Sequence, residues 1–96
     1  MFKFSFLVNP ISGGGQGKVI LNFVPEIMKS MGFDDSEWTA ELTNGKRLRE
    51  QIRETAEKTE TLIAVGGDGT MSTMLSVMLE SGLAGKVRIG LIPLGT

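Results

Sequence analysis

Several residue types are missing from this sequence of 96 residues, and each absence excludes a class of chemistry. There is no cysteine, so the chain holds no disulfide and no thiolate metal site, and a reducing, intracellular setting is expected. There is no histidine, which removes the commonest general base of enzymes. Any acid–base chemistry must therefore use a carboxylate, or a base that lies outside these residues.

Long apolar runs and an excess of charge are missing as well. No stretch approaches the ~20 apolar residues that a membrane span requires, and no basic segment leads into an apolar one with a cleavage site at the N-terminus. Ten basic and eleven acidic side chains give a net charge of −1, so a polyanion such as nucleic acid is not an expected partner. With 41% hydrophobic residues the chain is globular, and its length corresponds to one small domain or to part of a larger one.

The sequence alternates short apolar runs with amphipathic segments. The expected strands are residues 2–8, 37–42, 61–65 and 87–92, and the expected helices are residues 20–31, 45–58 and 71–79. The apolar face of the first helix comprises Ile20, Phe23, Val24, Ile27, Met28 and Met31. Gly32 is expected to end that helix, and Pro25 to kink it. The β-α-β-α-β-α-β order predicts an α/β fold, in which a parallel sheet carries helices on both faces and the third strand is central.

A glycine-rich loop from Asn9 to Lys18 follows the first expected strand. Glycines let the backbone approach an anion closely, and the N–H groups and positive dipole end of the following helix attract it. The loop is not a Walker A motif, because Val19 replaces the Ser/Thr that would bind magnesium, and it is not a dinucleotide fingerprint, because Lys18 replaces the third glycine. Its glycine density favours phosphate binding over the alternative of a flexible strand-to-helix turn.

A second loop, Gly66-Gly-Asp-Gly-Thr70, follows the most apolar strand. Its glycines leave room for a nest of N–H groups around phosphates, and Asp68 would then face magnesium directly or through water. The alternative is an ordinary turn in which Asp68 or Thr70 caps the next helix. Residues 93–96 after the fourth strand are a weaker signal. Thr43 after the second strand is weaker still, and its default role is to cap the second helix. Ligands of open parallel sheets bind beyond the carboxyl ends of the strands, so these segments are expected to line one cleft at one sheet edge.

Three motifs at these separations resemble the catalytic domain of diacylglycerol kinases, sphingosine kinases and similar bacterial lipid kinases: Asn9-Pro-x-Ser-Gly13, Gly66-Gly-Asp-Gly-Thr70 and Pro93-Leu-Gly-Thr96. The resemblance covers the whole chain. NAD kinases share the second motif, but the first and third favour the lipid kinases. The resemblance implies the NAD kinase/diacylglycerol kinase-like N-terminal domain, here truncated. Residues 1–96 would be its nucleotide-binding part, and the family's C-terminal β-rich, lipid-binding domain would be absent.

The same resemblance implies an activity and a set of ligands. The expected activity is that of an ATP-dependent lipid kinase, which uses Mg²⁺ and transfers the γ-phosphate to diacylglycerol or a related lipid alcohol. The expected location is cytoplasmic and peripheral to the membrane, with transient contact at its surface, and a homo-oligomer is compatible with the sequence. The residues expected to contact ATP are Asn9, Pro10, Ile11, Ser12, Gly13, Thr43, Gly66, Gly67, Asp68, Gly69, Thr70, Met71, Ser72 and Thr96. Thr39 is the alternative to Thr43, and Asp68 is the candidate metal ligand. No catalytic residue is expected in this chain, since the resemblance places the base downstream, and the isolated chain is expected to be inactive.

The sequence departs from the family pattern directly after the second loop. Family members carry Asn-Glu where this chain has Ser72 and Thr73, so an acidic group near the nucleotide is lost. This difference supports one alternative, a nucleotide-binding fragment without catalysis. A second alternative is NAD kinase-like phosphotransfer, in which a ribose hydroxyl would replace the lipid hydroxyl as acceptor.

Overall fold

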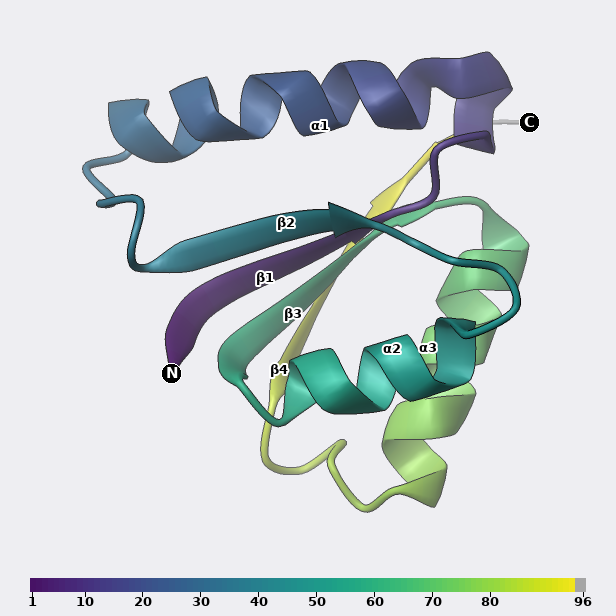
Figure 1. Cartoon of the computed structure of the whole chain (residues 1–96). Helices are drawn as coiled ribbons and strands as arrows, with labels where there is room; N and C mark the ends of the chain where they lie inside the picture. The colour runs from purple at the N-terminus through teal and green to yellow at the C-terminus, as the bar shows by residue number, and fades with distance from the viewer. Residues whose placement is uncertain (95–96) are drawn as a thin grey trace.

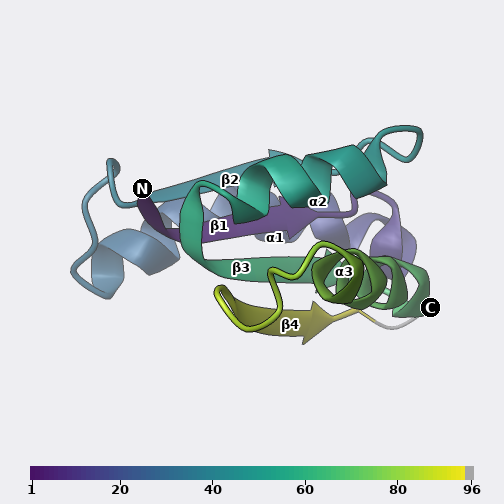
Figure 2. The ribbon, with the colours of Figure 1, turned by 90° about the horizontal axis from the view of Figure 1, so that it is seen from below.

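The computed structural model describes residues 1–94, whose helices and strands alternate as predicted (Figure 1). The strands are β1 (Phe2–Val8), β2 (Trp38–Leu42), β3 (Thr59–Gly66) and β4 (Arg88–Pro93), and the helices are α1 (Ser12–Ser30), α2 (Leu48–Ala56) and α3 (Asp68–Glu80). The strands form one parallel sheet in the order β2-β1-β3-β4. Helix α1 covers one face of the sheet, and α2 and α3 cover the other (Figures 1 and 2). The predicted α/β fold, with β3 inside the sheet, is confirmed.

Among the strands, the two inner ones carry the fully buried side chains. Successive side chains of a strand point to opposite faces, so Leu7 packs with the α2 and α3 side and Val8 with the α1 side. On β3, Leu62 packs on the α2 and α3 side and Val65 on the α1 side. All four of these side chains are at most 1% exposed. Burying an aliphatic side chain of this size contributes about 1.5–3 kcal/mol. The apolar character of β1 and β3 therefore places them at the centre of the sheet.

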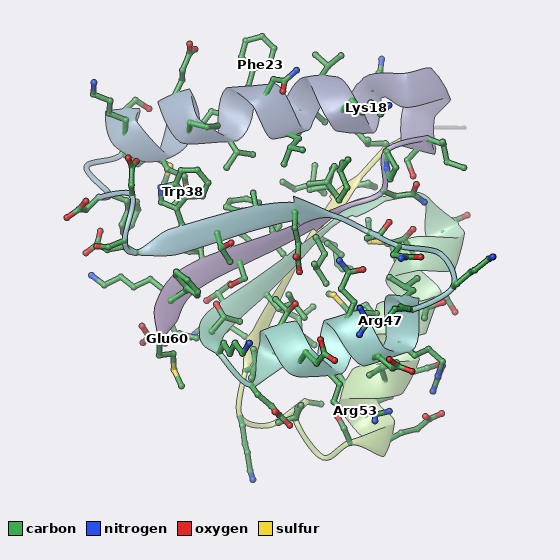
Figure 3. All side chains as sticks on the ribbon, viewed as in Figure 1. Lys18, Phe23, Trp38, Arg47, Arg53 and Glu60 are labelled. Carbon is green, nitrogen blue, oxygen red and sulfur yellow. The ribbon has the colours of Figure 1, made fainter. Side chains whose placement is uncertain are left out.

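Helix α1 buries less of its apolar face than the sequence predicts. Val24 and Met28 are each 2% exposed, but Phe23, Ile27 and Met31 are 52%, 49% and 62% exposed. Phe23 projects from the side of α1 that faces away from the sheet (Figure 3). Residues four apart lie above one another on a helix, so these three form a flank rotated away from the buried stripe. The sequence therefore predicted a wider buried face for α1 than the structure has.

Glycine residues mark both ends of the regular part of α1. Gly32 has a φ of 85° directly after the last residues of α1, which confirms its predicted role as the left-handed end of that helix. Non-helical dihedral angles within α1 occur at Gly13–Gly15, and Pro25 keeps helical ones. The interruption therefore lies in the glycine-rich loop and not at the proline.

Candidate functional site

The carboxyl ends of the four strands meet at one edge of the sheet, and backbone hydrogen bonds join the segments that follow them. The N–H groups of Thr43, Asn9 and Leu94 donate to the carbonyls of Val8, Val65 and Gly66, at 2.9, 2.8 and 2.9 Å. These bonds extend the parallel ladders one residue past the strand ends. The prediction that both glycine loops share one sheet edge is confirmed. Thr96 lies outside the described residues.

The first glycine loop has a left-handed backbone. Gly13, Gly14 and Gly15 have φ angles of 62°, 67° and 97°, a conformation that side chains disfavour. Ile11, two residues before Gly13, is in the right-handed region, with φ −97° and ψ −7°. Turns that mix right- and left-handed residues present successive N–H groups as a concave anion-binding nest. The loop therefore has the type of backbone that a phosphate site requires.

Gly17 has a packing role that its position in the sequence does not reveal. It is buried, and a Cβ placed on it would lie 2.0 Å from the carbonyl oxygen of Asn9. The first right-handed turn of α1 thus rests directly on the end of β1. Gly17 is required for packing between helix and strand, and it fixes where the first loop lies.

Two side chains of the first loop are hydrogen-bonded to the second loop. The Nδ2 of Asn9 donates to the Oγ1 of Thr70 at 3.0 Å. The N–H of Gly67 donates to the Oγ of Ser12 at 3.1 Å. The Ser12 oxygen acts as an acceptor in this bond, so the hydroxyl proton stays available for a ligand oxygen. The two glycine loops form one connected unit.

The second loop presents its acidic residue at the start of α3. The N-cap of that helix is Gly67 and no side chain caps it, so the alternative in which Asp68 or Thr70 is the cap does not apply. Asp68 and Gly69 are exposed in the first turn, where a helix attracts anions. Ser72 is also exposed, whereas Met71 is half-buried and packs against the core beneath α3.

The candidate residues of the first loop also differ in exposure. Pro10 and Ser12 are half-buried, and Ile11 is 78% exposed. A Cβ on Gly13 would lie 3.2 Å from the Cβ of Leu94, so this loop also approaches the segment after β4. The predicted residues of these three segments therefore lie together.

Thr43 lies at the same edge, at the end of β2, but it does not cap α2. That helix starts at Leu48 and not at residue 45 as predicted, and its N-cap is Arg47. The intervening loop is held by Gln51, whose Oε1 accepts from the Asn44 N–H and whose Nε2 donates to the Leu42 carbonyl, both at 2.9 Å. Gln51 is a residue that sequence reasoning missed, because nothing in its spacing indicates a contact with the loop before its own helix.

Replacing Gln51 with alanine is expected to lower the free energy of unfolding by about 1–2 kcal/mol, since two hydrogen bonds are lost. Gln51→Glu is the matched control: it keeps the acceptor for the Asn44 N–H and loses the donor, so about half of the effect is expected. Urea denaturation measures both values. Equal stability of Gln51→Ala and the wild type would show that these bonds do not hold the loop.

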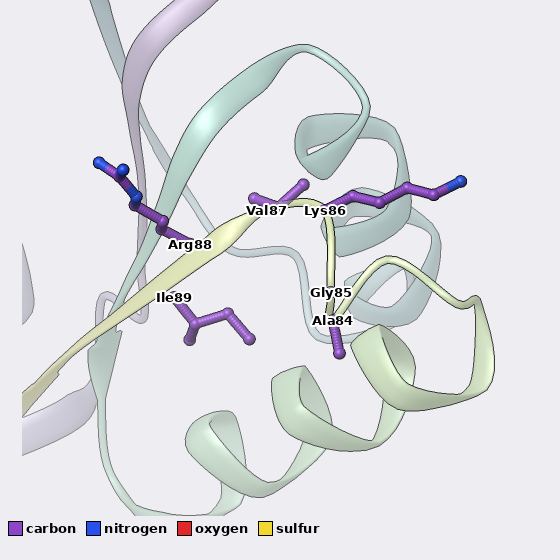
Figure 4. A pocket seen from close by; sticks show the side chains of 6 residues that line it. All are labelled: Ala84, Gly85, Lys86, Val87, Arg88 and Ile89. Atoms are coloured by element: carbon purple, nitrogen blue, oxygen red, sulfur yellow. The ribbon is translucent and has the colours of Figure 1, made fainter.

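The opposite edge of the sheet has a different character. A shallow hollow of about 680 Å³ lies there, lined by six consecutive residues before and within the start of β4, Ala84 to Ile89 (Figure 4). A hydrogen bond from the Asp34 N–H, together with Lys3, lowers the pKa of Glu37 at this edge. The hollow is remote from both glycine loops and gathers no converging set of polar side chains.

The described residues lack two further features. Residues 1–94 contain no group of three or more His, Cys, Asp or Glu side chains that could hold a metal ion by themselves. None of the helices that these residues form has the length and apolarity that crossing a bilayer requires.

The sequence and the fold both have known relatives. The sequence model of the family described as diacylglycerol kinase catalytic domain matches residues 3–96. The chain belongs to this family. Over 90 residues it is 36% identical to mouse (Mus musculus) diacylglycerol kinase iota and 33% identical to a diacylglycerol kinase of Staphylococcus carnosus (strain TM300). These alignments cover 93% and 94% of the chain, but only 8% and 28% of those two proteins.

The fold of this chain also matches a solved structure. A crystal structure of a diacylglycerol kinase from Bacillus anthracis str. Sterne superposes with a TM-score of 0.74 at 23% identity. The superposition covers 98% of this chain and 31% of that one. The fold predicted from the family resemblance is confirmed, and the chain spans less than a third of these bacterial relatives.

Proposed function

We propose that this chain forms the ATP-binding part of a lipid kinase that phosphorylates diacylglycerol or a related lipid alcohol at a membrane surface. The observation that carries the proposal is the connected pair of glycine loops at the carboxyl edge of the sheet. Membership of the diacylglycerol kinase catalytic domain family supports the reaction class.

The loops offer several features that suit a polyphosphate. The left-handed glycines of the first loop supply a backbone nest, and α1 and α3 both begin at this edge. The hydroxyl of Ser12 can donate to a phosphate oxygen, since its own oxygen already accepts from Gly67. A nucleotide triphosphate would therefore meet N–H and O–H donors from both loops.

Magnesium fits the residues present as an ion shared with the nucleotide. Mg²⁺ is typically held by one or two carboxylates together with substrate phosphates and water. Asp68 offers one exposed carboxylate at the start of α3. When bound, the ion would neutralise phosphate charge. Asp68 is the residue of this chain that would hold it, directly or through water.

In the proposed reaction, the hydroxyl oxygen of the lipid forms a bond to the γ-phosphorus of ATP. The bond from that phosphorus to the bridging oxygen breaks and ADP leaves. Catalysis of such transfers depends mainly on positioning and charge neutralisation, which glycine loops provide. The hydroxyl proton needs a base, and we assign that base to a part of the kinase outside this chain, where the family resemblance places it.

One observation favours a second candidate function, nucleotide binding without phosphotransfer. Ser72 and Thr73 occupy the positions after the second motif where we expect Asn-Glu in active relatives. Assays with ATP and diacylglycerol, or with ATP and NAD, separate the three possibilities. Labelled phosphatidic acid supports the lipid kinase, labelled NADP supports NAD kinase-like phosphotransfer, and ATP binding without either product supports the second candidate.

Gly69 offers a test of the ATP site that is independent of folding. It is exposed, its φ is not in the left-handed region, and a Cβ there would meet nothing within 4 Å. Alanine is a better helix residue than glycine, so Gly69→Ala is expected to leave stability unchanged or raise it by about 0.5–1 kcal/mol. In the proposed site the added methyl blocks the approach of phosphate, and ATP affinity should fall about tenfold or more.

Gly85→Ala is the matched control for this test. Gly85 has the same open surroundings but lies before β4, at the opposite edge of the sheet. Calorimetric titration of the complete kinase that contains this chain, with ATP and Mg²⁺, should give wild-type affinity for Gly85→Ala. Wild-type affinity for Gly69→Ala as well would contradict the placement of the phosphates at the second loop.

A further inference from the structure

The residues expected to contact ATP differ in how far a ligand can reach them. Ile11, Asp68, Gly69 and Ser72 are exposed at the sheet edge. Thr70 is only 6% exposed, and Gly66 is also buried. Burial at a position next to a proposed phosphate site calls for a role other than direct contact.

Asn9 is half-buried, and both ends of its side-chain amide are engaged. Its Oδ1 accepts from the N–H of Ile11 at 3.1 Å, which turns the first loop. Its Nδ2 donates to the Thr70 Oγ1, which belongs to a residue 61 positions later in the chain. The amide thus connects the turn of one loop to the helix that follows the other.

The glycine at position 66 makes room for this connection. A Cβ on Gly66 would lie 2.9 Å from the Thr70 Oγ1, 3.0 Å from the Thr70 Cβ and 3.2 Å from the Asn9 Cβ. All three distances are shorter than ordinary van der Waals contact, so a side chain at this position would push Asn9 and Thr70 away. The absence of a side chain on Gly66 is explained by these two neighbours without any ligand.

On the basis of the proposed ATP site, we infer that Asn9 and Thr70 are positioning residues and do not touch the nucleotide. Their hydrogen bond fixes the distance between the glycine-rich loop and the start of α3. Donors from the two loops can then meet the same polyphosphate without rearrangement, which is the gain that preorganisation gives. Ser12 and Gly67 form a second bond between the same loops, and these two remain on the ligand side.

The proposal predicts that Asn9 and Thr70 act as a unit on ATP affinity. In the complete kinase that contains this chain, Asn9→Ala and Thr70→Val should each weaken MgATP binding about tenfold, because either change releases the same connection. The double variant should also lose about tenfold. Thr70→Ser keeps the hydroxyl acceptor and should bind within about twofold of the wild type.

Two matched controls separate the positioning role of Asn9 and Thr70 from the effect of losing the same side-chain groups elsewhere in the chain. The Oδ1 of Asn44 accepts from the N–H two residues later at 3.1 Å, as that of Asn9 does, but no bond from Asn44 reaches the second loop within the described residues. Asn44→Ala should therefore retain wild-type affinity. Thr55→Val makes the same chemical change as Thr70→Val at a buried position on α2, where it removes a hydrogen bond to Glu41 and none to a glycine loop, so wild-type affinity is expected for it too. Thermal unfolding of every variant shows which ones fold.

The ATP affinities of the two single variants and the double variant decide whether Asn9 and Thr70 act together. Single losses that multiply to about a hundredfold in the double variant would show that Asn9 and Thr70 contact ATP separately, which overturns the proposal. If Asn9→Ala does not fold, Thr70→Val still decides, because valine keeps the shape of threonine: wild-type affinity of this variant would also overturn the proposal. Absence of MgATP binding by the wild-type kinase would instead contradict the proposed function itself.

Discussion

Replacing Gly17 with alanine is expected to lower the free energy of unfolding by about 3–5 kcal/mol, which is at the upper end of single substitutions. The new Cβ would lie 2.0 Å from the Asn9 carbonyl oxygen and 3.0 Å from the carbonyl carbon. Both are backbone atoms at the end of a buried strand, so neither can rotate away. Helix α1 must shift away from β1, and contacts of Val24 and Met28 with the sheet are lost with it. Thermal unfolding should show a decrease in Tm of roughly 15–25 °C.

Gly14→Ala is the control for this prediction. Gly14 also requires a special backbone, with φ 67°, but a Cβ there would meet nothing within 4 Å. Only the left-handed strain remains, which costs about 1–2 kcal/mol. Equal destabilisation by the two substitutions would contradict the close approach of α1 to β1.

Replacing Asp68 with asparagine is expected to reduce kcat of the proposed lipid kinase by about a hundredfold or more, because the proposal assigns magnesium to this carboxylate. Stability should change little. Asp68 is exposed and does not cap α3, so the only loss is its attraction to the positive end of the helix, about 0.3–1 kcal/mol. Steady-state assays over a range of Mg²⁺ concentrations check the first expectation, and urea denaturation checks the second.

Asp35→Asn serves as the control for charge. Asp35 is exposed in the connection between α1 and β2, at the opposite edge of the sheet. Its replacement removes the same charge and should leave kcat unchanged. Normal turnover of Asp68→Asn at limiting Mg²⁺ would rule out the metal role.

The sequence was sufficient to predict the fold, and the reason lies in a few strong signals. The apolar run of β3 indicated a central, buried strand, and Gly32 marked the end of α1 because few other residues adopt its backbone conformation. Periodicity was less reliable for α1, where Phe23 fits the apolar face but lies 52% exposed. Spacing along a helix shows which residues share a side, but the width of the sheet beneath determines how many of them are covered.

The loops of the site were predicted as segments, but their internal organisation was not. Gly17 and Gly69 look alike in the sequence, and only the structure shows that one is pressed against a carbonyl oxygen and the other lies in open space. The bond from Asn9 to Thr70 joins residues 61 positions apart, a distance over which no pattern in one sequence carries information. The β2–α2 loop was misread for a similar reason, since Gln51 holds it from within the following helix.

The central position of β1 has a consequence for how the protein is made. This strand is synthesised before both of its partners, β2 on one side and β3 on the other, where Phe2 lies opposite Thr59. At 5–20 residues per second, about 3–12 s pass between synthesis of Val8 and of Gly66, the last residue of β3. During that interval an apolar strand with unpaired edges is open to pairing with other nascent chains. Slower translation of the first two thirds of the chain would therefore lower the yield of folded protein without altering the stability of the finished product.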